Sequence, residues 1–130
     1  MSMNDTLAAA MSKIEMAEKL GNATCKIYPS SKIIKNILTL MKDKGYIGEY
    51  KESSESKGGL LSINLLGKLN KCGAIKPRFA VKKEEFEKFE KRFLPAKGFG
   101  FLVVSTPSGF LTHEEAKKKN FGGKLIAYFY

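Results

Sequence analysis

Residues 99–116 decide the fold of the second half of the chain and read FGFLVVSTPSGFLTHEEA. The run over residues 99–104 is continuously apolar, which is typical of a strand buried on both faces of a sheet. Residues 106–109 (TPSG) then place proline and glycine at the positions that a β-turn prefers. Phe110 and Leu111 resume the strand. The pattern therefore predicts a β-hairpin with a polar turn.

The hairpin leads into a short helix, because residues 112–115 (THEE) have the sequence of a capping box. The lysines at 117–119 stand at the end of this helix, where cations interact favourably with the last carbonyl groups. We expect Gly122 and Gly123 to break the helix. Residues 124–130 then form a final strand whose side chains alternate between two faces.

The sequence before this stretch predicts a strand followed by an amphipathic helix. Residues 79–81 have the pattern of a short strand, and Phe86, Phe89 and Phe93 recur at the spacing of one helical face. Pro95 ends this helix, since proline cannot continue it.

The first half of the chain shows a similar alternation of helical and strand patterns. Ser30 and Ser31 precede an apolar helical stripe, so their hydroxyls are candidate N-caps. The pattern predicts, in order, a helix over residues 5–20, a strand over 24–28, a helix between Ser31 and Gly45, a strand beginning at 46–50, a mobile polar loop over 52–57 and a strand over 60–66.

The stretch over residues 67–77 changes character, because it is rich in glycine and lysine and has few bulky apolar residues. Such composition marks a domain boundary. The fold class is therefore α+β. We expect residues 1–69 to form an N-terminal α-β-α-β-β unit and residues 70–130 to form a mainly β C-terminal unit with short helices.

The chain is strongly basic: its 130 residues include 23 Lys and Arg against 13 Asp and Glu, a formal net charge of +10. The excess lies mostly in residues 71–130, where 13 basic residues face 6 acidic ones. A basic chain with 43% apolar residues has a core and points first to nucleic acid and second to an anionic membrane surface. No apolar run approaches the roughly 20 residues of a spanning helix, and the N-terminus lacks the pattern of a secretion signal. We expect a cytoplasmic protein.

Residues suited to catalysis or metal binding are scarce. Cys25 and Cys72 stand far apart without a CxxC partner, so we expect reduced structural thiols and neither zinc nor a disulfide framework. The one histidine, His113, sits beside acids at a helix start and is expected to be an exposed first-turn residue rather than a general base. The glycines do not form phosphate-binding motifs. We expect no catalytic residue, no metal and no cofactor. We therefore predict that the chain is not an enzyme.

The polar run over residues 105–109 allows two interpretations. On local sequence alone, a polar hairpin turn is favoured. The alternative is an RNA contact, because three hydroxyls and free backbone N–H groups suit the 2′-hydroxyls and phosphates of A-form RNA. Gly122 and Gly123 would let the backbone approach a phosphate, with Lys124 as a point charge. The lysines at 117–119 are more commonly a solvated helix end.

Several blocks of the chain resemble one protein family. Residues 104–116 followed by 122–130 resemble the C-terminal signature of the small-subunit ribosomal protein eight family. The resemblance extends through the whole chain, in the blocks at residues 4–8, 28–32, 44–49 and 70–79. The last of these blocks, with the extended helix end at 87–95, looks like the archaeal and eukaryotic branch rather than the bacterial one.

The resemblance implies a two-domain structural protein of the small ribosomal subunit, with residues 70–130 as the RNA-binding domain. Such a protein binds directly to the central domain of 16S-type ribosomal RNA, at an irregular helix with an internal loop, and promotes subunit assembly. The implied partners are this RNA and neighbouring ribosomal proteins, with no membrane and a monomer before incorporation. Some relatives also repress their own messenger RNA. The alternative is a sequence-blind nucleic-acid-coating or membrane-surface protein, for which a charge of +10 suffices.

The resemblance also implies the RNA-binding residues by position. They are Asp5, Thr6, Ser31 and Lys32 near two helix starts, and Ser105, Thr106, Pro107, Ser108, Gly109, Gly122, Gly123 and Lys124 in the second half. Ser105 and Thr106 would contact base and ribose. Two positions depart from the pattern: Pro107 replaces a third hydroxyl, and Lys124 replaces a glutamate of bacterial members, which turns an acceptor into a phosphate-facing donor.

Overall fold

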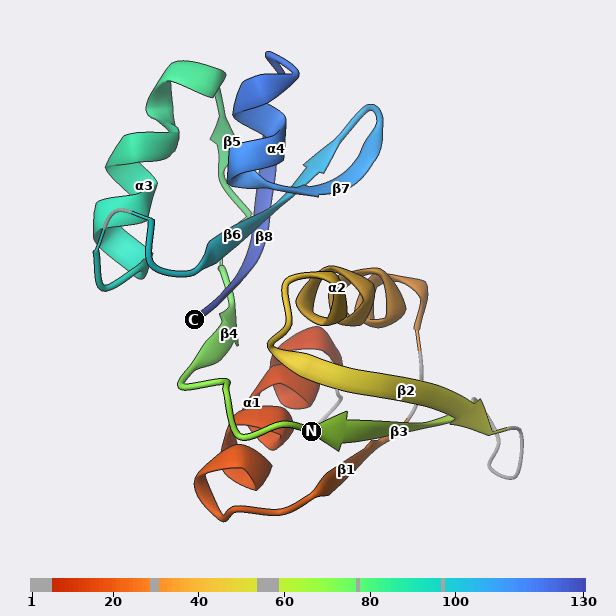
Figure 1. The fold of residues 1–130 in the computed structure, drawn as a ribbon. Helices are drawn as coiled ribbons and strands as arrows, with labels where there is room; N and C mark the ends of the chain where they lie inside the picture. The colour runs from red at the N-terminus through yellow and green to blue at the C-terminus, as the bar shows by residue number, and fades with distance from the viewer. Residues whose placement is uncertain (1–5, 29–30, 54–58, 77, 97) are drawn as a thin grey trace. The chain divides into compact units, whose positions relative to one another are not determined.

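The computed structural model describes residues 6–28, 31–53, 59–76, 78–96 and 98–130. The chain forms two compact units, one ending at Cys72 and one beginning at Gly73 (Figure 1). We call them the N-terminal unit and the C-terminal unit. The assignment of residues 1–69 and 70–130 to two domains stays a prediction.

The N-terminal unit consists of two helices and an antiparallel sheet. Apolar residues at helical spacing bury one face of α1 (Thr6–Lys19) and one face of α2 (Lys32–Asp43). The sheet has the order β1-β3-β2, and its strands are β1 (Thr24–Ile27), β2 (Ile47–Ser53) and β3 (Leu60–Leu65). Alternation along β1 buries Cys25 and Ile27, as predicted.

Local sequence sets the helix ends in this unit. Ser31 is the N-cap of α2, and its hydroxyl accepts a hydrogen bond from the backbone N–H of Ile34 at 3.2 Å. Gly21 and Gly45 follow α1 and α2 in the left-handed region, with φ of 74° and 80°. Glycine is favoured at such helix ends because it has no β-carbon to clash.

The C-terminal unit is mainly β with short helices, so the predicted α+β class is confirmed. Its sheet has the order β4-β8-β6-β7, and β5 also pairs with β8. The strands are β4 (Cys72–Ala74), of which Gly73 and Ala74 belong to this unit, β5 (Ala80–Val81), β6 (Phe101–Thr106), β7 (Gly109–Thr112) and β8 (Gly123–Phe129). A 3-10 helix (Lys83–Glu85) leads into α3 (Phe86–Phe93), and α4 spans His113–Lys118.

The apolar run of the predicted hairpin lies in the centre of this sheet. The strand β6 lies between β8 and β7, and its residues Leu102, Val103 and Val104 are each 0% exposed. Phe86 and Phe89 of α3 belong to the same core cluster as Leu102 and Val104. The predicted capping box at the start of α4 is also confirmed.

Several predicted element boundaries are wrong. Phe99 is 54% exposed and lies outside β6, because Gly100, with φ of 98°, interrupts the extended backbone before Phe101. Gly123 belongs to β8, and α4 already ends at Lys118, two residues before Asn120, which has φ of 60°. The short strand β4 has no counterpart among the predicted elements.

Two further predictions are corrected within strands. Glu52 and Ser53 of the predicted polar loop lie in β2. The rest of that loop lies outside the described residues, as does Ser30, one of the two candidate N-caps. Strict alternation along β8 is interrupted, because the register with β6 shifts at Ile126. Such a shift is the mark of a β-bulge. None of the described helices has the length and apolar character needed to cross a membrane.

Candidate nucleic-acid interface

The predicted hairpin is formed by β6 and β7, and it carries the candidate site at its turn. Ser105 pairs with Phe110 and Thr106 with Gly109 in an antiparallel register, which leaves residues 107–108 as the turn. Gly109 has φ of 103°, a conformation that favours glycine. In Figure 1 this turn is the end of the C-terminal unit farthest from α3.

The Thr106 hydroxyl is engaged within the turn itself. It donates a hydrogen bond to the carbonyl of Gly109 at 2.8 Å and accepts one from the backbone N–H of Ser108 at 3.1 Å. The residue is 9% exposed. A hydroxyl has one donor and two acceptor sites, so one acceptor site remains after these bonds. Thr106 therefore braces the turn.

Ser105 and Ser108 differ from Thr106 in this respect. Ser105 is half-buried and Ser108 is exposed, as are Pro107 and Gly109. Among the described residues, none forms a hydrogen bond with the side-chain hydroxyl of Ser105 or Ser108. Both hydroxyls are therefore available to a partner outside the chain.

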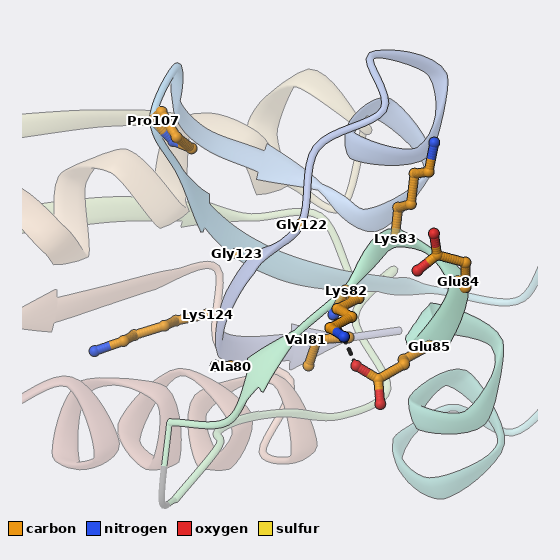
Figure 2. A pocket seen from close by; sticks show the side chains of 10 residues that line it. All are labelled: Ala80, Val81, Lys82, Lys83, Glu84, Glu85, Pro107, Gly122, Gly123 and Lys124. Carbon is orange, nitrogen blue, oxygen red and sulfur yellow. Dashed lines mark hydrogen bonds between the residues drawn. The ribbon is translucent and has the colours of Figure 1, made fainter.

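The second predicted segment, residues 122–124, lies beside the hairpin. Lys124 pairs with Ser105 of β6 on one side and with Ala80 of β5 on the other. The structure thus brings together two stretches that are separated in the sequence. The side chain of Lys124 is exposed, and Figure 2 shows it extending away from Lys82 and Lys83.

Gly122 and Gly123 have a structural reason within the chain. A β-carbon on Gly122 would lie 2.6 Å from the carbonyl oxygen of Val81. A β-carbon on Gly123 would collide with the carbonyl oxygen of Ser105. Close packing of β8 against β5 and β6 therefore requires both glycines, whatever backbone approach they offer to RNA.

An open cavity of about 590 Å³ lies at this surface (Figure 2). Four predicted site residues line it, namely Pro107, Gly122, Gly123 and Lys124, together with residues 80–85. The cavity wall thus includes two lysines, Lys82 and Lys83, that the sequence analysis did not select. Their signal in the sequence is their position directly after the predicted strand at residues 79–81.

Two of the charged side chains that line this cavity form hydrogen bonds within the chain. The carboxylate of Glu85 accepts a hydrogen bond from the backbone N–H of Lys82 at 2.9 Å, which Figure 2 marks with a dashed line. The ammonium of Lys83 donates to the side chain of Asn120 at 3.4 Å. Lys82 and Lys124 are exposed and remain available to an anion.

The N-terminal unit places its predicted residues at the starts of two helices. Thr6 is the first residue of α1 and Lys32 the first residue of α2, where Lys32 is exposed. The Ser31 hydroxyl already accepts the capping bond from Ile34. Asp5 lies outside the described residues.

The expectation of an exposed His113 is wrong. The residue is 1% exposed, and its Nδ1 atom accepts a hydrogen bond from the backbone N–H of Leu102 at 3.0 Å. Its Nε2 atom lies 3.5 Å from the Glu90 carboxylate, which also accepts a 2.6 Å hydrogen bond from Lys117. Burial lowers the pKa of His113 below 6.5, although Glu90 opposes the shift.

Glu90 is a buried carboxylate with two cationic or polar neighbours. Burial raises the pKa of this carboxyl, but the hydrogen bond from Lys117 and the neighbouring His113 outweigh that effect, so the pKa lies below its ordinary value. Sequence reasoning missed this network because its partners come from different helices.

The two cysteines are buried and free. The thiol of Cys72 donates a hydrogen bond to the carbonyl of Met11 at 3.2 Å. Burial raises the pKa of Cys72 to about 12. A thiol that stays protonated is a poor nucleophile, so Cys72 serves packing.

Fold and surface together are those of a small, basic α+β protein that presents lysines and hydroxyls around a hairpin turn. A family model described as Ribosomal protein S8 matches residues 5–130, nearly the whole chain. The chain therefore belongs to the ribosomal protein S8 family. It is a non-enzymatic, structural protein of the small ribosomal subunit that binds ribosomal RNA, has ribosomal proteins as further partners and serves translation.

Proposed function

We propose that this chain binds directly to the central domain of small-subunit ribosomal RNA, at an irregular helix with an internal loop, and promotes subunit assembly. One observation carries the proposal: the hairpin turn and residues 122–124 form one surface, joined by the pairing of Ser105 with Lys124. A polar turn beside positive charge suits a partner that offers both hydroxyls and phosphates.

The hydroxyls of Ser105 and Ser108 contact ribose and base edges in this proposal, because no described residue engages them. Thr106 keeps the turn in shape and offers its remaining acceptor site. Pro107 and Gly109 support the turn. Recognition therefore depends on short polar side chains that approach the wide minor groove of an RNA helix closely.

Lysines supply the part of the affinity that does not depend on RNA sequence. Lys124 and Lys82 are exposed at the cavity, so both ammonium groups face phosphates in the proposed complex. Gly122 and Gly123 have no side chain that would keep a phosphate away from the backbone. Phosphate contacts of this kind fix the register and orientation of the protein on the RNA.

The N-terminal unit adds contacts to the RNA backbone. We assign these contacts to Asp5, Thr6, Ser31 and Lys32, of which Lys32 is exposed at the start of α2. The N-terminal ends of helices favour anions such as phosphate. Residues 70–130 then form the domain that selects the RNA site, and residues 1–69 the domain that reinforces it.

The resemblance of residues 70–79 supports membership of the archaeal and eukaryotic branch of the family. In the proposed assembly order, the protein is a monomer that binds RNA first and meets its neighbouring ribosomal proteins within the growing subunit. Regulation of its own messenger RNA would follow from a similar RNA structure in that message, read by the same surface.

The test compares two RNAs of equal length. Binding of the purified chain to a central-domain fragment of its own ribosomal RNA is measured against binding to an unrelated duplex at the same salt concentration. We expect clearly tighter binding to the central-domain fragment, because an internal loop exposes unpaired base edges that a regular duplex does not offer. Equal affinity for both RNAs would instead identify a sequence-blind coating protein.

A further inference from the structure

A buried polar network joins α3, α4 and β6 of the C-terminal unit. Glu90 of α3 is 4% exposed and His113 of α4 is 1% exposed. Glu90 accepts the hydrogen bond from Lys117 and lies 3.5 Å from Nε2 of His113, while Nδ1 of His113 accepts from the N–H of Leu102. None of these residues belongs to the proposed RNA surface, so the proposed function leaves the network without a role.

We propose that His113 is a positioning residue for RNA binding: its imidazole holds the base of the β6–β7 hairpin and thereby fixes the turn that carries Ser105 and Ser108. The inference rests on the function proposed above, because it concerns how that same surface is held in place.

The register of the hairpin shows what the imidazole does. Thr112, the last residue of β7, pairs with Val103, and the next residue of β6 toward the base is Leu102. The chain turns into α4 at His113, so β7 offers no further backbone partner to Leu102. The Nδ1 atom accepts the Leu102 N–H at 3.0 Å in its place. The side chain thus extends the hairpin pairing by one step.

This arrangement requires one protonation state of His113. An imidazole that accepts at Nδ1 carries its proton on Nε2, and here Nε2 faces Glu90. A second proton would place an N–H on Nδ1, directly opposite the N–H of Leu102. Two donors would then face each other at a buried site, where each is left without an acceptor. Protonation therefore breaks the hydrogen bond between Leu102 and His113 at the base of the hairpin.

The charged groups that face His113 come from both helices. They are Glu90 from α3, and Lys117 and Glu114 from α4. From β6, the ring of Phe101 lies with its centroid 6.3 Å from that of the imidazole. Burial lowers the pKa of His113 and so keeps the ring neutral near neutral pH, while Glu90 acts in the opposite direction. The hydrogen bond from Leu102 to His113 is therefore present at neutral pH and lost in acid.

The experiment measures the dissociation constant for the central-domain RNA fragment from about pH 7.5 to about pH 5, which reaches below the ordinary range of histidine because burial lowers the pKa of His113. The full chain is compared with His113→Asn, whose side-chain oxygen takes the position of Nδ1 and does not titrate. We expect the unchanged protein to lose about fivefold or more in affinity toward the acid end, while circular dichroism shows it folded. His113→Asn should lose less. An identical loss in both proteins would overturn the proposal.

A second pair of variants keeps the test decisive if His113→Asn fails to fold. Glu90→Gln removes the charge that favours protonation of His113, so the acid loss of affinity should move to lower pH. Glu87→Gln is the matched control, because Glu87 is an exposed residue of the same helix. It should leave the pH profile unchanged. Equal profiles for the two variants would contradict the role of the network.

Two readouts separate this inference from the proposed function. Ser105→Ala and Ser108→Ala test the RNA surface at neutral pH, and normal affinity in both variants would reject the proposed function. Hydrogen exchange of the Leu102 amide tests the network without RNA. A lower protection factor of this amide in acid, relative to its intrinsic exchange rate at each pH, that His113→Asn suppresses, together with unchanged RNA affinity, would show that the network stabilises the hairpin but does not position it for RNA.

Discussion

The carbonyl oxygen of Ser105 occupies the space that a β-carbon on Gly123 would need. Real β-carbons do not approach a backbone oxygen so closely. The contact brings β8 against β6 at the position where Lys124 pairs with Ser105. The hairpin and Lys124 can therefore lie side by side because Gly123 has no side chain.

Replacement of Gly123 by alanine is expected to destabilise the C-terminal unit by about 1–3 kcal/mol, the usual cost of overpacking. The added methyl group must move backbone rather than a flexible side chain. Urea unfolding measures the change. Gly48→Ala is the control, because its β-carbon would lie 3.2 Å from the Asn64 side chain, a milder contact. A larger loss for Gly48→Ala would contradict this account.

Replacement of Thr106 by valine should destabilise the hairpin by about 1–3 kcal/mol, the usual net value of two intramolecular hydrogen bonds. Valine keeps the shape of the side chain but removes the hydroxyl that bonds to Gly109 and Ser108. Thr106→Ser keeps the hydroxyl and should retain most of the stability. Thermal unfolding distinguishes the two variants, and equal stability would show that the hydroxyl does not brace the turn.

Loss of the Ser105 or Ser108 hydroxyl should weaken RNA binding without weakening the fold. Each alanine variant is expected to lose about 1–3 kcal/mol of binding free energy if its RNA partner is left unpaired. Stability should be unchanged, since no described residue bonds to either hydroxyl. Filter binding or calorimetry, with unfolding curves on the same samples, checks both parts. A variant that unfolds early would point to an intramolecular role.

Removal of a lysine at the cavity should change the salt dependence of binding rather than its selectivity. For Lys82→Ala and Lys124→Ala, the slope of log affinity against log salt should fall by nearly one unit for each duplex phosphate that the lysine no longer neutralises. Lys118→Ala is the control, since Lys118 is exposed at the end of α4. An equal fall for Lys118→Ala would indicate a diffuse electrostatic interaction.

The free energy of unfolding should decrease as the pH falls below about 6.5, the ordinary pKa of histidine. The pKa of His113 is lower in the folded state than in the unfolded state, so the unfolded chain takes up the proton first. Uptake of protons by the unfolded state lowers the free energy of unfolding as the pH falls. Urea midpoints across this range measure the effect. His113→Asn should lack this component of the pH dependence.

A further loss should occur in stronger acid through Glu90. Its pKa is lowered in the folded state, so its contribution is present above the unfolded value of 4.5 and disappears as the pH falls through the folded value. Glu90→Gln should remove this second decline and cost stability at neutral pH, because Lys117 loses its anionic partner. The unfolding free energy at each pH provides the measurement.

Local patterns in the sequence predict most of the fold because they act within a few residues. The apolar run before Ser105 predicts β6, the TPSG turn predicts the hairpin and the capping box predicts α4. The short strand β4 escapes prediction because its three residues, Cys72–Ala74, carry little apolar periodicity. Its pairing with β8 is a property of the folded sheet.

The candidate site is less predictable, because its chemistry depends on contacts between distant residues. The burial of His113 requires Glu90 from another helix and Leu102 from another strand, and no local pattern signals either. The bonds of the Thr106 hydroxyl depend on the turn geometry. The lysines at 82 and 83 reach the site only because β5 pairs with β8.

The pairing of β8 also orders events during synthesis of the protein. This strand pairs with β4, β5 and β6, yet it is the last strand along the described chain. Since translation proceeds from the N-terminus and domains fold as units, the proposed RNA surface cannot form around Lys124 until β8 has left the ribosome that makes it. A nascent chain interrupted before Gly123 would therefore lack both Lys124 and the strand that joins β5 to β6.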